Sequence, residues 1–256
     1  MKLHYRKYGS GQPLIILHGL FGHSDNWNTL AKQFAESGFE VYAVDLRNHG
    51  LSPHSAEWTY ALMTADLNEL VDELKLEHAI LLGQSMGGLV CMQFAVTHPD
   101  KVDKLIVVDM APKKYPPHHA HVIAGLQSID FSVVKTRKEA EEKLSEFIKD
   151  NPTRQFLLKN LYWINDNTLA WRFNLASIAA NYHRLAEFFN TETSRYPGPT
   201  WFIRGGKSDY VLDGDWPMIQ RVFPDSTLIT IPDAHHWVHA EQPKIFYDAV
   251  MEIIGK

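Results

Sequence analysis

A serine flanked by glycines is the pattern in this chain that most clearly suggests chemistry. Ser85 lies within Gly83-Gln84-Ser85-Met86-Gly87, after the apolar run 79–82 and before a helical pattern that includes Leu89. A serine held between a strand and a helix adopts a strained backbone conformation, and its hydroxyl is exposed beside the amides of the helix N-terminus. The pattern predicts a nucleophilic serine. The alternative is a tight turn in which the glycines are structural.

The serine needs a base, because its hydroxyl is a weak nucleophile until its proton is removed. When the serine comes first, its partners follow in the order acid and then histidine, so the base is expected late in the chain. His235 and His236 both follow the strand expected at 227–231. We favour His236, because the apolar residues Trp237 and Val238 would anchor its backbone. His235 is the alternative base.

Two aspartates compete for the acid that orients the imidazole. Asp109 follows the apolar run 105–108, at the strand end where open α/β sheets carry their sites, whereas Asp209 ends the loop 205–209. A strand end holds a side chain better than a double-glycine loop, and a carboxylate there needs a partner. Asp109 is therefore the preferred acid, and Asp209 is the alternative.

The oxyanion of an acyl-transfer intermediate requires two amide donors. One is expected from Met86, directly after the serine. The other should come from a glycine-rich turn after an early strand, and the segment 18–22, which reads His-Gly-Leu-Phe-Gly after the apolar run 14–17, fits that place. We expect the second donor to be the amide of Leu20.

Alternating strands and helices must position these groups. Short, continuous apolar runs are typical of strands buried on both faces, and they occur at 14–17, 41–44, 79–82 and 105–108. Two further strands are expected late in the chain, at 201–203 and 227–231. Between them, residues 66–74 place leucine and valine at helical spacing, and a closing helix follows Pro243. This alternation predicts an α/β fold with a parallel sheet and helices on both faces.

The middle of the chain breaks this alternation. Residues 113–195 carry helix signals and no convincing strand, which predicts a helical cap between two parts of the core, residues 1–112 and 196–256. The cap is rich in aromatic residues. We expect Trp163 and Trp171, together with Phe21, to line an apolar acyl pocket, although many cap aromatics should form the core of the cap itself.

Composition excludes several classes of protein. The 256 residues include 25 basic and 30 acidic ones, a net charge of −5, so no positive field favours nucleic acid. The single cysteine, Cys91, rules out an internal disulfide, and no apolar run approaches the ~20 residues of a membrane span. We therefore expect a cytoplasmic protein. The histidines 118, 119 and 121 beside Pro116 are expected in a solvated loop and not at a metal.

The motifs together resemble the α/β-hydrolase superfamily, with the closest likeness to the YbfF-type bacterial serine esterases. The resemblance rests on the segments 18–22, 45–52, 83–88 and 236–241 and covers essentially the whole chain. It implies an eight-stranded, mostly parallel sheet with a helical cap after the sixth strand. It also implies an acid moved from the loop 205–209 to Asp109. Gln84 and His235 depart from the commoner histidine and glycine at their positions.

The expected function is that of a serine carboxylesterase without metal or organic cofactor. Its substrates would be small-molecule esters of short-to-medium acyl chains, with acyl-CoA thioesters as a further group, cleaved through an acyl-enzyme on Ser85. Alternatives are a carbon–carbon hydrolase, lyase or perhydrolase with the same triad, and a non-catalytic ligand receptor. A receptor needs no oxyanion hole, which makes that alternative the weakest. Oligomeric state is not encoded in any of these motifs.

Overall fold

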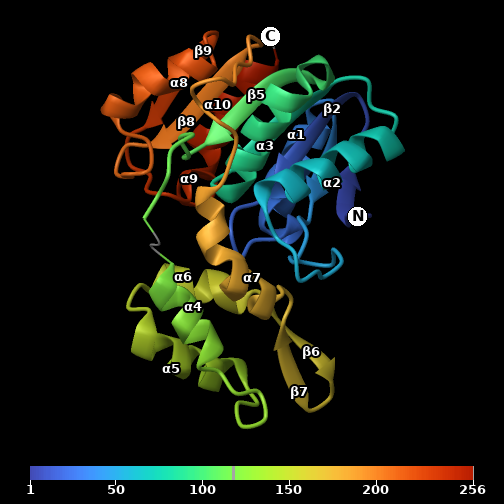
Figure 1. The fold of residues 1–256 in the computed structure, drawn as a ribbon. Helices are drawn as coiled ribbons and strands as arrows, with labels where there is room; N and C mark the ends of the chain where they lie inside the picture. Colours follow the sequence, from blue (N-terminus) through green and yellow to red (C-terminus); the bar gives the residue numbers. More distant parts are fainter. Residues whose placement is uncertain (117–118, 256) are drawn as a thin grey trace.

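A mostly parallel sheet forms the centre of the molecule (Figure 1). The computed structural model describes residues 1–116 and 119–255. The strands lie in the order β1 (Tyr5–Tyr8), β3 (Phe39–Val44), β2 (Gln12–Leu17), β4 (Ala79–Gln84), β5 (Val102–Val108), β8 (Thr200–Gly205) and β9 (Ser226–Ile231), and only β1 runs antiparallel to its neighbour.

The predicted α/β architecture is confirmed, but the count of strands differs from the expectation. The main sheet has seven strands among the described residues, not eight, because only one antiparallel strand precedes the parallel ones. The cap segment accordingly follows the fifth strand of the chain and not the sixth.

Helices on both faces account for the continuous apolar runs. In β2, Leu14 and Ile16 pack into the core on one face of the sheet, and Ile15 and Leu17 pack into the core on the other. All four are fully buried. A strand covered on both faces has no polar face to present, so its sequence shows no alternation.

Each face has its own helices. One is covered by α1 (Asn28–Glu36) and α10 (Pro243–Ile254), and the other by α2 (Tyr60–Glu73), α3 (Met86–Thr97) and α8 (Trp216–Val222). Short helical segments join them: η1 (Ser24–Trp27), η2 (Pro99–Lys101), η4 (Asp213–Asp215) and α9 (Val238–Glu241). No helix among the described residues has the length and hydropathy needed to cross a bilayer.

The cap segment projects from the sheet, between β5 and β8 (Figure 1). It contains α4 (Ala120–Gln127), α5 (Arg137–Phe147), α6 (Asn151–Leu158), the strands β6 (Leu161–Asn165) and β7 (Thr168–Trp171), α7 (Leu175–Asn181) and η3 (Tyr182–Ala186). The expectation of helices alone was wrong here. β6 and β7 form an antiparallel hairpin that is partly solvated, so its stability comes from pairing and not from a buried apolar run.

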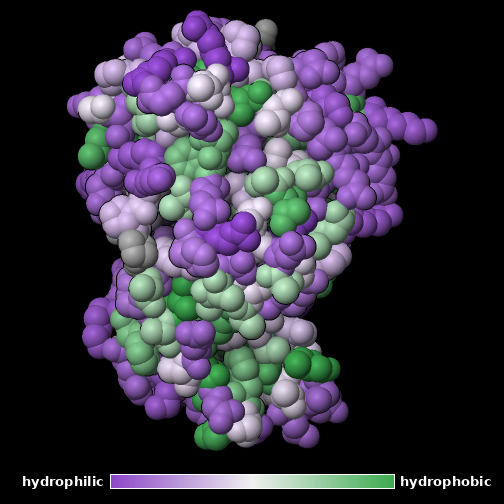
Figure 2. All heavy atoms as spheres, in the orientation of Figure 1, coloured by the Kyte–Doolittle hydropathy of each residue, from purple (hydrophilic) through white to green (hydrophobic). Residues whose placement is uncertain are grey.

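Several large apolar side chains of the cap segment face solvent. Figure 2 shows hydrophobic residues gathered on the part of the molecule that the cap segment occupies in Figure 1. The exposed ones in this segment are Val133, Phe147, Trp163 and Ile164. Trp163 is 53% exposed, so its side chain does not lie in the interior of the cap segment.

Candidate active site

Ser85 occupies a strained turn at the carboxyl edge of the sheet. It stands between the end of β4 and the first residue of α3, with φ 53° and ψ −120°. The turn is held by a hydrogen bond from the Ser85 amide to the Val108 carbonyl at 3.0 Å. The following helix approaches the sheet so closely that a Cβ on Gly87 would stand 2.5 Å from the Leu17 carbonyl oxygen. The conformation therefore depends on glycine beside the serine.

Asp109 meets His236 across this edge. His236 Nδ1 lies 2.8 Å from Asp109 Oδ2. The aspartate is fully buried and also accepts hydrogen bonds from the Gly205 amide at 3.1 Å and the Ser208 hydroxyl at 2.5 Å. Both carboxylate oxygens thus accept hydrogen bonds, and the one facing His236 favours the tautomer with the proton on Nδ1.

That tautomer leaves the other ring nitrogen of His236 free to accept a proton. The Gln84 side-chain amide approaches His236 Nε2 at 3.4 Å, and the amide group can only donate there. The Tyr210 ring stacks on the imidazole with 3.7 Å between centroids. Both neighbours fix the plane of the ring. His236 is thus oriented with its Nε2 atom beside Gln84, the residue before Ser85.

The alternative acid and base lie elsewhere. Asp209 is exposed and makes no hydrogen bond with the described residues. The His235 side chain is 64% exposed, and its Nδ1 lies 2.9 Å from Glu241 Oε2. The structure therefore brings Asp109 and His236 together beside Ser85, and it does not bring Asp209 or His235 into that arrangement.

The turn that carries Leu20 rests directly on the serine. A Cβ on Gly19 would stand 3.3 Å from Ser85 Cβ. The Gly19 carbonyl accepts from His18 Nδ1 at 2.7 Å and from the Gly22 amide at 2.9 Å. The Gly19 carbonyl and the Leu20 N–H belong to the same planar trans peptide and point in opposite directions. The hydrogen bonds that fix the carbonyl therefore also fix the direction of the N–H. Neither this amide nor that of Met86 donates to an acceptor among the described residues.

Two buried histidines support this turn, and the sequence reasoning did not identify their role. The Nε2 atoms of His18 and His49 accept from the amides of Leu46 and Phe21, at 3.0 and 3.3 Å. Burial lowers the pKa of each histidine to about 3. Each is therefore neutral, with one nitrogen donating and the other accepting. The sequence does offer one signal for this supporting role, because each of the two histidines directly precedes a glycine.

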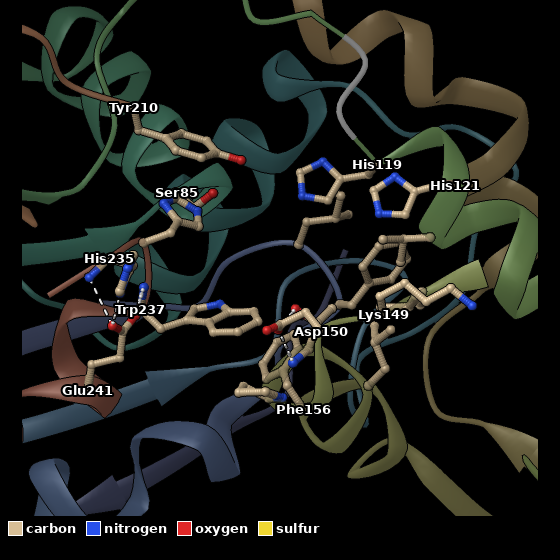
Figure 3. Close-up of a pocket in the computed structure, with 18 of the residues that line it drawn as sticks. Ser85, His119, His121, Lys149, Asp150, Phe156, Tyr210, His235, Trp237 and Glu241 are labelled. Atoms are coloured by element: carbon tan, nitrogen blue, oxygen red, sulfur yellow. Dashed lines mark hydrogen bonds and ion pairs between the residues drawn. The ribbon is translucent and has the colours of Figure 1, made fainter. Parts of the chain in front are cut away.

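Two cavities meet at Ser85. The larger, of about 960 Å³, lies between the core and the cap segment, and Phe156 packs on Trp237 there (Figure 3). The smaller, of about 270 Å³, is lined mainly by apolar residues and tyrosines. The residues that border both cavities are Leu20, Ser85, His119 and Tyr210. A substrate bound at Ser85 can therefore place its two halves in different surroundings.

Of the three predicted pocket residues, one lines a cavity at Ser85. Phe21 lines the larger cavity, but Trp163 and Trp171 line neither. Hairpin pairing turns Trp163 toward solvent, and Trp171 stacks on Phe173 in the interior of the cap segment. Aromatic content alone does not reveal which way such side chains point.

The histidine cluster matches its expected solvated loop only in part. His119 precedes α4, whereas His121 lies in α4 and is exposed. Both line the larger cavity opposite Ser85 (Figure 3). His118 lies outside the described residues. Among the residues at 1–116 and 119–255, no group of acidic, histidine or cysteine side chains could hold a metal ion.

Comparison with known proteins identifies the family. The family model described as the alpha/beta hydrolase fold matches residues 12–243. The chain is 39% identical over 253 residues to the sn-1-specific diacylglycerol lipase ABHD11 of Danio rerio, covering 96% of this chain and 79% of that protein. It is 32% identical over 248 residues to esterase YbfF of Escherichia coli K12, covering 96% and 93%.

A solved structure described as a marine microorganism esterase superimposes with a TM-score of 0.95 at 44% identity, covering 99% of this chain and all of that one. The chain therefore belongs to the α/β-hydrolase fold family. Within this family it is an ester hydrolase, similar to the YbfF-type esterases.

Proposed function

We propose that this protein is a serine carboxylesterase that cleaves short-to-medium acyl esters, with Ser85 as nucleophile, His236 as base and Asp109 as its orienting acid. The observation that carries the proposal is the 2.8 Å contact between His236 Nδ1 and Asp109 Oδ2 beside the strained serine. The amides of Leu20 and Met86 are the proposed oxyanion donors. The segment 113–195 acts as the cap that encloses the substrate.

In the first step, His236 Nε2 takes the proton of the Ser85 hydroxyl as Oγ bonds to the carbonyl carbon of the ester. The carbonyl oxygen becomes an oxyanion that accepts from the two amides. When the intermediate collapses, the carbon–oxygen bond to the alcohol breaks, and the alcohol takes the proton from His236. The acyl group remains bonded to Ser85 as an ester.

In the second step, a water molecule gives a proton to His236 while its oxygen bonds to the acyl carbon. The same amides hold the second oxyanion. Collapse breaks the bond to Ser85 Oγ, which regains the proton from His236, and the carboxylic acid is released. The sum of both steps is ester plus water giving acid plus alcohol, and no cofactor takes part.

A fluorophosphonate probe tests the nucleophile directly. We expect rapid labelling at Ser85 alone, found by mass spectrometry of peptides, and no labelling of Ser85→Ala. The same variant should lose turnover of short p-nitrophenyl esters while keeping its circular dichroism spectrum and melting temperature. Turnover retained by Ser85→Ala would contradict the proposed mechanism.

The same measurements separate the alternatives. A ligand receptor would fold normally and resist the probe. A carbon–carbon hydrolase, lyase or perhydrolase would be labelled but would show its highest kcat/KM outside a panel of esters and acyl-CoA thioesters of graded chain length. The named relatives, a diacylglycerol lipase and an esterase, support ester bonds as the first substrates to assay.

A further inference from the structure

The smaller cavity contains a buried phenol without a partner. Tyr60, the first residue of α2, is 2% exposed and lines this cavity. Its hydroxyl makes no hydrogen bond to any residue at 1–116 or 119–255. Burial raises the pKa of Tyr60 above its usual value, so the phenol is protonated and keeps a proton to donate. Most buried polar groups are hydrogen-bonded, so this one requires an explanation.

Two neighbouring tyrosines of the same cavity are already engaged. The Tyr115 hydroxyl accepts from the Ala111 amide and donates to the Tyr210 carbonyl, both at 2.8 Å. The Tyr182 hydroxyl lies 3.0 Å from His119 Nδ1 and 3.1 Å from the His119 amide. Both hydroxyls thus stabilise the protein itself, whereas that of Tyr60 is available to a ligand.

The position of the base decides which half of an ester reaches this cavity. His236 and Gln84 line the larger cavity and not the smaller one. The leaving alcohol must receive its proton from His236, so it departs on the side of the larger cavity. Met86, a proposed oxyanion donor, lines the smaller cavity. The acyl chain therefore extends from Ser85 into the smaller cavity.

The lining of the smaller cavity disfavours a charged acyl chain. The described residues around it include no Lys, Arg, Asp or Glu; four are tyrosines, two are histidines, and half are apolar: Leu20, Met86, Leu89, Met110, Pro116, Leu185 and Ala186. A carboxylate here would lose its hydration without a lysine or arginine to replace it. A neutral oxygen, in contrast, can accept one hydrogen bond from a phenol at no such cost.

We propose that the smaller cavity binds acyl chains that carry a neutral oxo or hydroxyl oxygen, which accepts a hydrogen bond from the Tyr60 hydroxyl. This inference rests on the proposed esterase function and names the acyl half of its substrate. A plain alkyl chain would fill the cavity and leave the phenol unpaired, which disfavours it relative to the oxygenated chain.

The test compares matched pairs of p-nitrophenyl esters: pentanoate, hexanoate and heptanoate against 4-oxopentanoate, 5-oxohexanoate and 6-oxoheptanoate. Each kcat/KM is divided by the rate of hydroxide-catalysed hydrolysis of the same ester, which removes intrinsic reactivity. For at least one pair we expect a preference for the oxo ester of about tenfold, the size of one buried hydrogen bond.

Tyr60→Phe removes the oxygen and keeps the ring. We expect it to reduce the oxo preference to about one, to leave plain esters at least as active, and to retain or raise the melting temperature, since no protein hydrogen bond is lost. The control is Tyr247→Phe, whose hydroxyl contacts Ser37 outside both cavities. This variant should keep the preference of the parent protein.

Three results would overturn the inference: equal normalised kcat/KM for every pair, an oxo preference that survives in Tyr60→Phe, or a stronger preference for the hemi-ester of a dicarboxylic acid than for any oxo ester. All three leave the proposed function standing, because the plain esters are still cleaved. Failure to cleave any ester of the panel, together with no labelling of Ser85, would instead reject the proposed function.

Discussion

Ser208 Oγ lies 2.5 Å from Asp109 Oδ2, so a serine in the loop after β8 holds the carboxylate that follows β5. The same loop contains Asp209, the alternative acid. The loop therefore contributes a hydrogen-bond donor to Asp109, the proposed acid. Together with the Gly205 amide, it fixes the carboxylate from a neighbouring strand.

Asp109→Asn tests the acid. The amide would present a donor to His236 Nδ1 and favour the tautomer whose Nε2 is protonated and cannot act as a base. We expect kcat for p-nitrophenyl butanoate to fall by about 10⁴-fold with little change in KM. Asp209→Asn is the matched control and should stay within about twofold of the parent protein, as expected for an exposed side chain. If kcat fell in Asp209→Asn and stayed near that of the parent protein in Asp109→Asn, the acid would be Asp209.

His18 tests the support of the oxyanion donor. In His18→Ala the Gly19 carbonyl loses the hydrogen bond that directs the Leu20 amide, and we expect kcat to fall by about 100-fold at similar KM. In His18→Asn the side-chain amide can donate from a position close to that of Nδ1, so part of the activity should return. Equal kcat in all three proteins would show that His18 does not position the turn.

Ala186 and Trp163 test the proposed location of the acyl chain. Ala186 lines only the smaller cavity, so Ala186→Phe should shorten the longest acyl chain accepted. We expect the ratio of kcat/KM for octanoate to that for acetate to fall at least about tenfold through steric exclusion. Trp163→Ala should leave that ratio unchanged, because its side chain faces solvent. A shift of the ratio in the Trp163 variant alone would contradict this arrangement.

Because His18 and His49 are buried, we expect the folded protein to lose stability in mild acid. Burial lowers the pKa of His18 and of His49 to about 3, from 6.5 for the free side chain. Below pH 6.5 the unfolded chain therefore binds more protons than the folded one, and the free energy of unfolding decreases as the pH falls. Between pH 6.5 and 5, each histidine should remove about 2 kcal/mol.

Urea unfolding at pH 7 and pH 5 measures this effect. His49→Gln should reduce the difference between the two pH values by about 2 kcal/mol, provided that the variant folds. An identical pH difference in the parent protein and in the variant would rule out His49 as a source of the acid sensitivity.

Much of the fold was predictable because burial leaves a clear trace in sequence. The runs at 14–17, 41–44, 79–82 and 105–108 all lie in strands, since covered strands are apolar throughout. The edge strand β1 and the hairpin β6–β7 escaped detection. Both are partly exposed, so pairing with a neighbouring strand determines them more than their own composition does.

The geometry around Ser85 was predictable for a different reason. The serine turn, the strand end at Asp109 and the late His236 each follow a strand, and parallel strands bring their carboxyl ends to one edge. The cavity linings did not follow from such rules. The direction of Trp163 depends on hairpin pairing, and the stacking of Tyr210 on His236 depends on how a loop folds back after β8.

The cap segment leaves the sheet after β5 and returns before β8, and these two strands pair with each other. The cap segment is therefore an insertion between two paired strands, and the hydrogen bonds between these strands do not depend on it. Recombination or loop growth at the two junctions can replace the walls around Ser85 while Asp109 and His236 stay in register. New substrate ranges can evolve on this scaffold without reinventing its chemistry.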